Sequence, residues 1–261
     1  MKILFGAILV LLAAVQAQAA VTTQPVEYKH GDTILEGWLA YDDGLSGKAP
    51  GVLVAHEWWG LNDYAKKRAE ELAGMGYVAF ALDMYGKGVV TADPKEAAKL
   101  SGQVKGTPLM RERALAGLQV LAESERVDPS RIGAIGFCFG GTTVLELAYA
   151  GGKVAGVVSF HGGLTLPGPE DLSRIRSSIL VLHGAEDPHV PADEAAAFRE
   201  AMSKAGVDWQ MIYYGGAVHS FTNPDAGSTG LKGVAYDAKA AERSWTHMRV
   251  FFDEILKRDA P

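Results

Sequence analysis

The segment Arg131-Ile132-Gly133-Ala134-Ile135-Gly136-Phe137-Cys138-Phe139-Gly140-Gly141 decides the fold of this chain. Its apolar first half is typical of a buried strand, and it leads through Gly136-x-Cys138-x-Gly140 into a helical pattern. This is the nucleophile-elbow pattern of a strand-to-helix turn, with cysteine where serine is usual. The turn is strained, and side chains two residues before and after the nucleophile would clash, so both neighbours must be glycine.

Cys138 is therefore predicted to be a nucleophile. The turn places it at the amino terminus of a helix, where free N–H groups and the helix dipole favour a thiolate and can donate to an oxyanion. The alternative is a core cysteine beside a glycine-rich turn, but the position of the pentapeptide between strand and helix favours the nucleophile. Cys138 is also the only cysteine, which excludes an internal disulfide and a multi-cysteine zinc site.

The rest of the chain alternates short apolar runs with helical patterns. Residues 33–41 alternate like a half-exposed strand and are expected to form a hairpin with residues 26–29. Buried strands are expected at 51–55, 77–82, 132–136, 154–160, 179–183 and 210–214, and helices at 62–73, 94–102, 108–123, 142–150, 192–205 and 234–257. This alternation predicts an α/β fold in one domain, residues 20–261, with a mainly parallel sheet and helices on both faces. Ligands of such sheets bind at the carboxyl ends of the strands.

The first twenty residues are interpreted as an export signal. Met1-Lys2 precedes the apolar run 3–15, which is short for a membrane span, and Gln16-Ala17-Gln18-Ala19-Ala20 follows with small residues. This pattern predicts a signal peptide over residues 1–19, cleaved after Ala19 or Ala20. The mature protein is then expected to be exported, periplasmic or secreted, and free of the membrane.

Composition narrows the classes of partner. The 261-residue chain is 48% hydrophobic and 21% charged, so it can bury a sizeable core. Its 25 Lys and Arg against 31 Asp and Glu give a formal net charge of −6, without a block of like charges. A nucleic-acid partner bound through phosphate neutralisation is therefore disfavoured.

Two residues downstream of Cys138 complete a triad. A nucleophile needs a base, and the base needs a carboxylate that orients it. Asp187 follows the expected strand 179–183 and His219 follows the strand 210–214, so both lie at carboxyl ends of strands. The order Cys138, Asp187, His219 is the chain order of the α/β-hydrolase triad. Glu186 is the alternative acid.

Metal and nucleotide sites are disfavoured. His183, Asp187 and His189 could be interpreted as metal ligands, but their spacing matches no helical ligand pair, so no metal is expected. No phosphate loop and no G-x-G-x-x-G pattern opens a helix after the first strand.

A carboxylate and two tryptophans follow the first buried strand, in His56-Glu57-Trp58-Trp59-Gly60. In hydrolases of this fold one oxyanion donor is an N–H from the loop after this strand. We therefore assign the oxyanion hole to the backbone N–H groups of Trp58 and Phe139. Glu57 is expected to act in the site, with a helix cap as the alternative, and the tryptophans either fill the core or line the pocket.

These residues resemble the dienelactone hydrolase (carboxymethylenebutenolidase) family over nearly the whole chain after the signal. The resemblance is carried by His56-Glu57-Trp58-Trp59-Gly60, Asp83-Met84-Tyr85-Gly86, Gly136-Phe137-Cys138-Phe139-Gly140-Gly141 and His219-Ser220-Phe221. It implies a cofactor-free, monomeric α/β-hydrolase with Cys138, His219 and Asp187 as its triad. It also implies that Glu57 interacts with the thiol in the resting enzyme and helps to deprotonate it when substrate arrives.

Two positions depart from the family pattern. Where the well-studied members hold the substrate carboxylate with two arginines, the closest positions here carry Lys87 and Asn223. These two residues, with Trp59 and Tyr85, are expected to contact the substrate.

The function expected from the triad and the resemblance is hydrolysis of a small-molecule lactone or carboxylic ester through a cysteine thioester. The two departures and the export signal keep open a general exported carboxylesterase that acts on neutral esters. From a different class, the alternative is a noncatalytic hydrolase-like binding protein or a thiol-redox protein. The complete triad disfavours a binding protein, and the lack of a second cysteine disfavours a dithiol cycle.

Overall fold

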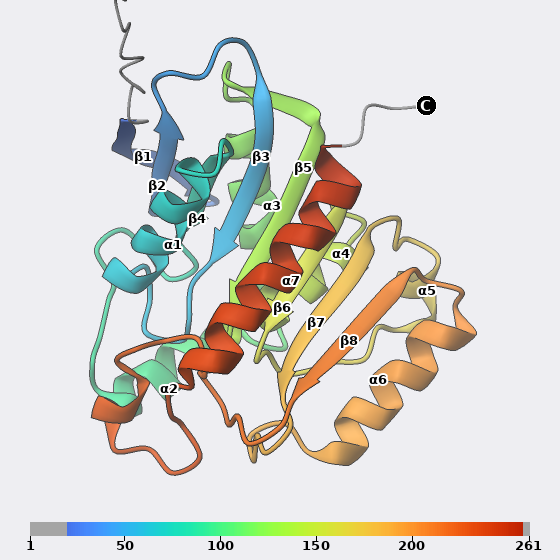
Figure 1. The fold of residues 1–261 in the computed structure, drawn as a ribbon. Helices are drawn as coiled ribbons and strands as arrows, with labels where there is room; N and C mark the ends of the chain where they lie inside the picture. The colour runs from blue at the N-terminus through green and yellow to red at the C-terminus, as the bar shows by residue number, and fades with distance from the viewer. Residues whose placement is uncertain (1–19, 258–261) are drawn as a thin grey trace, which may run out of the picture.

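Residues 20–257, the part of the chain that this computed structural model describes, form an eight-stranded sheet with helices on both faces (Figure 1). The strands are β1 (Val21–His30), β2 (Thr33–Asp42), β3 (Ala49–Ala55), β4 (Val78–Leu82), β5 (Val127–Phe137), β6 (Gly156–Phe160), β7 (Ser178–Gly184) and β8 (Trp209–Tyr214). The helices are α1 (Asp63–Ala73), α2 (Pro94–Val104), α3 (Pro108–Ala122), α4 (Phe139–Tyr149), α5 (Pro169–Leu172), α6 (Ala192–Lys204) and α7 (Ala238–Leu256), with a 3₁₀ turn η1 (Ala226–Thr229). This architecture confirms the predicted α/β-hydrolase fold.

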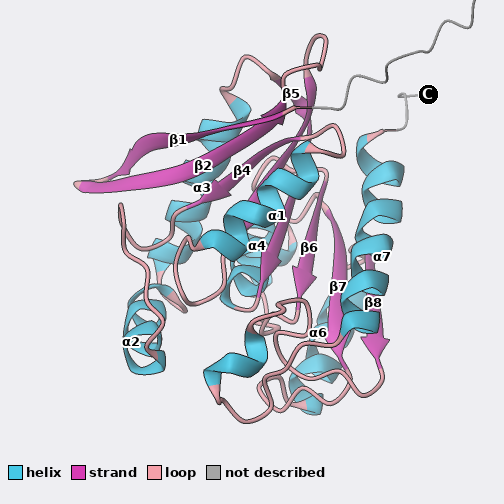
Figure 2. Cartoon of the chain, turned by 60° about the vertical axis from the view of Figure 1, so that its left-hand side comes forward, coloured by secondary structure: helices cyan, strands magenta, loops and turns pink. Residues whose placement is uncertain are grey.

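The strand order is β1-β2-β4-β3-β5-β6-β7-β8. From β4 to β8 the neighbours are parallel, while β1 and β2 form an antiparallel hairpin and β2 is antiparallel to β4. The hairpin was predicted, but its first strand is longer than expected and pairs from Val21 to His30. The hairpin reaches out beyond the rest of the sheet in Figure 2.

The parallel strands are buried on both faces, as their continuous apolar runs predicted. In β3, Leu53 and Ala55 contact the core on the side of α2, α3, α4 and α6, whereas Val52 and Val54 contact the core beneath α1 and α7. The two-residue period of a strand sends successive side chains to opposite faces. In Figure 1, α1 and α7 lie in front of the sheet.

Helix ends differ from the predicted boundaries for local reasons. The last helix was expected from residue 234 but begins at Ala238, because the Asp237 side chain caps it by accepting from the Ala240 N–H at 2.9 Å. Val234 instead forms a parallel bridge with His219. The four-residue α5 and η1 were not predicted, since such short turns carry no periodic pattern.

The predicted signal peptide, residues 1–19, lies outside the described residues. Within residues 20–257, no helix has the length and apolar content needed to cross a membrane.

Candidate active site

The turn after β5 has the geometry of a nucleophile elbow. Cys138 has φ = 54° and forms the N-cap of α4. A Cβ on Gly136 would lie 1.9 Å from the Gly140 carbonyl oxygen, and a Cβ on Gly140 would lie 2.1 Å from that of Ala55. No side chain fits at either position, so the sequence requirement for glycine follows from backbone contact with α4 and β3.

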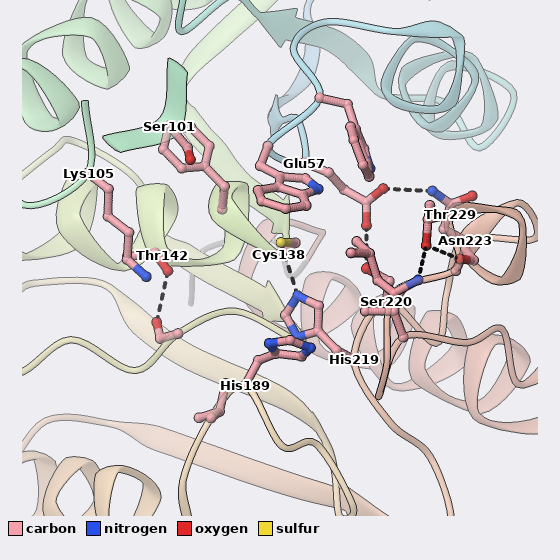
Figure 3. A pocket seen from close by; sticks show the side chains of 18 residues that line it. Glu57, Ser101, Lys105, Cys138, Thr142, His189, His219, Ser220, Asn223 and Thr229 are labelled. Atoms are coloured by element: carbon pink, nitrogen blue, oxygen red, sulfur yellow. Dashed lines mark hydrogen bonds between the residues drawn. The ribbon is translucent and has the colours of Figure 1, made fainter. Parts of the chain in front are cut away.

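Cys138, His219 and Asp187 form one continuous chain of contacts. Cys138 Sγ lies 3.0 Å from His219 Nε2 (Figure 3). His219 Nδ1 lies 2.8 Å from Asp187 Oδ2. Asp187 is buried, and its other oxygen accepts from the His189 N–H at 2.8 Å. Glu186 is exposed. The geometry therefore selects Asp187 over Glu186 as the acid that orients the histidine.

The surroundings of His219 make its imidazole a stronger base than a free histidine. Burial disfavours the charged ring, but the interactions with the Cys138 sulfur and the hydrogen bond to Asp187 outweigh it and raise the pKa of His219 well above its usual value. His219 is thus placed to take the thiol proton and to hold it close to the sulfur.

Glu57 lines the same pocket as Cys138, but its hydrogen-bond partners among residues 20–257 are not the thiol. Its carboxylate is buried and accepts hydrogen bonds from Ser220 Oγ at 2.9 Å and Asn223 Nδ2 at 2.6 Å (Figure 3). Burial raises the pKa of Glu57, and these two hydrogen bonds oppose the rise. The helix-cap alternative is wrong, because the side chain that caps α1 is Asn62.

The loop after β3 and the first residue of α4 face each other across Cys138. Trp58 and Phe139 both line the same pocket as the sulfur. Phe139 is the first residue of α4, so its N–H has no acceptor one turn earlier within the helix. Both residues thus lie where an oxyanion donor is needed, and their role stays a prediction.

The pocket that opens on Cys138 encloses about 300 Å³. One wall carries Trp58 and Trp59, so the tryptophans line the pocket rather than only fill the core. The lining also includes His189 and residues that the sequence does not mark: Ser101, Lys105, Thr142, Gly163, Val190, Ala226, Thr229, Leu231 and Val234. These come from segments whose sequences carry no motif, and only the tertiary fold brings them to the sulfur.

Two of the residues expected to contact the substrate do not line the pocket. Lys87 lies outside the pocket lining, where its ammonium pairs with Glu27 at 2.7 Å and Glu36 at 3.0 Å on the β1–β2 hairpin. Tyr85 is buried, and its hydroxyl donates to the Trp58 carbonyl at 3.0 Å, so it supports the pocket wall from behind.

Asn223 and Trp59 do line the pocket. The Asn223 amide is occupied on both sides, because Nδ2 donates to Glu57 and Oδ1 accepts from the Asp225 N–H at 3.0 Å. Asn223 therefore holds Glu57 with one of its two amide N–H groups.

No metal site accompanies the triad in residues 20–257. That part of the chain contains no group of three His, Cys, Asp or Glu side chains placed to hold a metal ion. His183 packs edge to face on Tyr213 at 5.3 Å, and His189 packs against His219 at 5.1 Å.

Comparison with known proteins agrees with this geometry. Residues 35–256 match the dienelactone hydrolase family. The structure superposes, with a TM-score of 0.87, on a dienelactone hydrolase-like promiscuous phosphotriesterase from metagenomic libraries. That protein is 45% identical, and the match covers 90% of this chain and 99% of the other.

Curated relatives show the same extent of similarity. Protein usf of Aquifex pyrophilus is 30% identical, over 89% of this chain and 99% of its own. A relative from Aquifex aeolicus with the name "Putative carboxymethylenebutenolidase" is 29% identical, over 90% of this chain and 99% of its own.

Proposed function

The chain belongs to the dienelactone hydrolase family and is a hydrolase, and we propose on that premise that it cleaves a lactone or carboxylic ester through a thioester on Cys138. The observation that carries the proposal is the unbroken line of contacts from Asp187 through His219 to the Cys138 sulfur, which ends in the pocket. Each contact is within hydrogen-bonding distance, so a proton can move between sulfur and imidazole without rearrangement.

Acylation begins when His219 takes the thiol proton. The sulfur then attacks the carbonyl carbon, the C–S bond forms, and the carbonyl oxygen becomes an oxyanion beside the N–H groups of Trp58 and Phe139. The C–O bond to the leaving group breaks as that bond's electron pair takes the proton held by His219. For a lactone the leaving alkoxide remains in the same molecule, because the ring opens.

Deacylation reverses the proton path. His219 deprotonates a water molecule, which attacks the thioester carbonyl, and the C–S bond breaks to release a carboxylic acid. The sulfur leaves as the thiolate, and Asp187 keeps the imidazole in the tautomer that presents Nε2 to water and sulfur.

A second candidate activity is hydrolysis of a neutral phosphotriester. It is favoured by the 45% identical relative, which is a promiscuous phosphotriesterase, and by the apolar wall formed by Trp58, Trp59, Leu231 and Val234. The thiolate would form an S–P bond as the P–O bond to the leaving group breaks, and water activated by His219 would then cleave the S–P bond.

We propose further that the protein is exported, with residues 1–19 as its signal peptide. The structure supports this because β1 begins at Val21, so cleavage after Ala19 or Ala20 would leave every described element intact. Amino-terminal sequencing of the protein from the periplasmic or secreted fraction should find Ala20 or Val21 first. A mature chain that retains residues 1–19 would contradict the proposal.

Mass spectrometry of a trapped intermediate tests the thioester. The mature enzyme is mixed with an aryl ester of a bulky acid, quenched in acid and digested, and the peptide that contains Cys138 should gain the mass of the acyl group. Cys138→Ala should lose turnover and labelling while it keeps its fold, since removal of a small side chain at a turn leaves little cavity. Undiminished turnover in Cys138→Ala would refute the proposal, and a neutral aryl phosphotriester run in parallel tests the second activity.

A further inference from the structure

His161 lies directly behind the nucleophile, yet the triad does not use it. It follows β6, is fully buried and has φ = 41°. The Cys138 backbone N–H donates to His161 Nδ1 at 3.1 Å and also to the Phe160 carbonyl at 3.0 Å. The backbone of the nucleophile is therefore held by two acceptors, one of which is an imidazole ring.

The second ring nitrogen of His161 is also engaged. Its Nε2 lies 2.7 Å from Thr222 Oγ1, which in turn lies 2.7 Å from the Tyr64 hydroxyl. Because Nδ1 accepts from the Cys138 N–H, the proton of a neutral ring must be on Nε2 and is donated to Thr222. The hydroxyl of Thr222 thus fixes the tautomer of His161, in which Nδ1 is the acceptor that faces the Cys138 N–H.

Thr222 lies in the loop that carries the base, His219. It lies three residues after His219, and its carbonyl accepts from the half-buried Arg68 guanidinium at 2.8 Å. Tyr64 and Arg68 both lie on α1, so one helix holds Thr222 by side chain and backbone. The contacts connect the loop that carries the base to the turn that carries the nucleophile.

Backbone strain occurs at the nucleophile, at His161 and close to Thr222. Among residues 20–257, the non-glycine residues with positive φ are Cys138, His161 and Ser220. Strained conformations persist only where the surroundings hold them, and they cluster at functional sites. Cys138 and His161 are joined by the 3.1 Å hydrogen bond, and Ser220 is two residues before Thr222.

We propose that His161 is a positioning residue: as a neutral Nε2–H tautomer fixed by Thr222, it holds the Cys138 backbone so that the sulfur stays aligned with His219. This rests on the proposed function of Cys138 as nucleophile.

The surroundings keep the ring neutral. Burial is the main cause that lowers the pKa of His161 well below its usual value, and the charges of His219, Arg68 and His183 act in the same direction. A protonated ring would place an Nδ1–H against the Cys138 N–H, so two donors would face each other.

The test uses a matched pair of variants at Thr222. Thr222→Val keeps the shape and removes the hydroxyl, whereas Thr222→Ser keeps the hydroxyl. Since a small misplacement of reacting groups costs up to about a hundredfold in rate, we expect Thr222→Val to lower kcat about tenfold with KM unchanged, and Thr222→Ser to restore it to within about twofold. The melting temperature of each variant is measured to separate loss of fold from loss of alignment.

A second measurement needs no active variant. In the wild-type protein labelled with ¹⁵N-histidine, the ring nitrogens of His161, assigned by their disappearance in His161→Asn, should show the neutral Nε2–H tautomer. A neutral Nδ1–H tautomer, or Thr222→Val with wild-type kcat, would overturn the proposal. If Cys138→Ala is inactive while Thr222→Val is unaffected, the positioning proposal fails alone; if Cys138→Ala retains turnover, the proposed function fails first.

Discussion

Removal of the Lys105 ammonium should change the preference of the enzyme for charged substrates, whereas removal of the Lys87 ammonium should not. Lys105 is the C-cap of α2 and lines the pocket near Thr142 (Figure 3). A Cβ on Gly163 would lie 3.4 Å from Lys105 Nζ and 3.2 Å from Thr142 Oγ1, so the absence of a side chain at Gly163 leaves room beside the ammonium. Within residues 20–257 the Lys105 ammonium forms no ion pair within 4.0 Å.

The expected change in kcat/KM follows from the solvent exposure of Lys105. Lys105 is exposed, so its attraction to a substrate anion is reduced by water, and a solvated ion pair stabilises by about 0.2–1 kcal/mol. At the upper end, about 1 kcal/mol corresponds to about fivefold in kcat/KM. Lys87 is already paired with Glu27 and Glu36 outside the pocket, so its loss should leave both kinds of substrate unaffected.

The assay compares kcat/KM for an anionic lactone and for its neutral methyl ester, in wild type, Lys105→Ala and Lys87→Ala. We expect Lys105→Ala to lower the ratio of anionic to neutral substrate about threefold to fivefold, and added salt to reduce the wild-type ratio in the same direction. A fall in this ratio on Lys87→Ala, or an unchanged ratio on Lys105→Ala, would refute the reasoning.

Three further changes test the site. Asp187→Asn should lower kcat about a hundredfold or more, because the amide no longer fixes the imidazole tautomer. Glu186→Gln, at an exposed position, should keep wild-type kcat, and equal losses of kcat in the two variants would contradict Asp187 as the acid that orients His219. Burial raises the pKa of Glu57, so the wild type should lose stability relative to Glu57→Gln as pH rises from 4.5, the ordinary value, and a pH-independent difference in urea unfolding would contradict this. Gly140→Ala should lower the melting temperature and the thiol alkylation rate, because its Cβ would meet the Ala55 carbonyl at 2.1 Å; an unchanged melting temperature would show that the turn can relax.

The fold could be predicted from sequence because its signals are local. The apolar runs of β3 to β8 are bounded by Gly, Asp or Pro, and such short continuous runs indicate buried strands. Helix starts were harder to place: α4 begins at Phe139, three residues before the predicted start, because the elbow itself forms the first turn. Helix boundaries depend on caps and contacts that a periodic pattern does not contain.

The site was predictable only where the chemistry and the backbone depend on the same residues. Gly136 and Gly140 mark Cys138 because backbone contacts forbid any other residue there. Lys105 could not be found this way, since a lysine at the end of a helix is usually solvated and only the tertiary fold brings it to the pocket. The position of Lys87 along the chain likewise does not reveal that its ammonium pairs with Glu27 and Glu36 on the hairpin.

The contacts of Glu57 explain how a second acid can share this pocket without competing for the thiol. Ser220 and Asn223 follow His219 closely in the chain, and together they bind both oxygens of Glu57. The loop that presents the base to Cys138 therefore also holds the carboxylate away from it, and the hydrogen-bonding partner of the sulfur is His219. Because Asn223 is a neutral amide, it satisfies the carboxylate without adding a positive charge, so burial is left to raise the pKa of Glu57. Displacement of Asn223 would remove one of the two hydrogen bonds that hold the Glu57 carboxylate. Because Thr222 is adjacent to Asn223 in the chain, its contact with His161 would change at the same time.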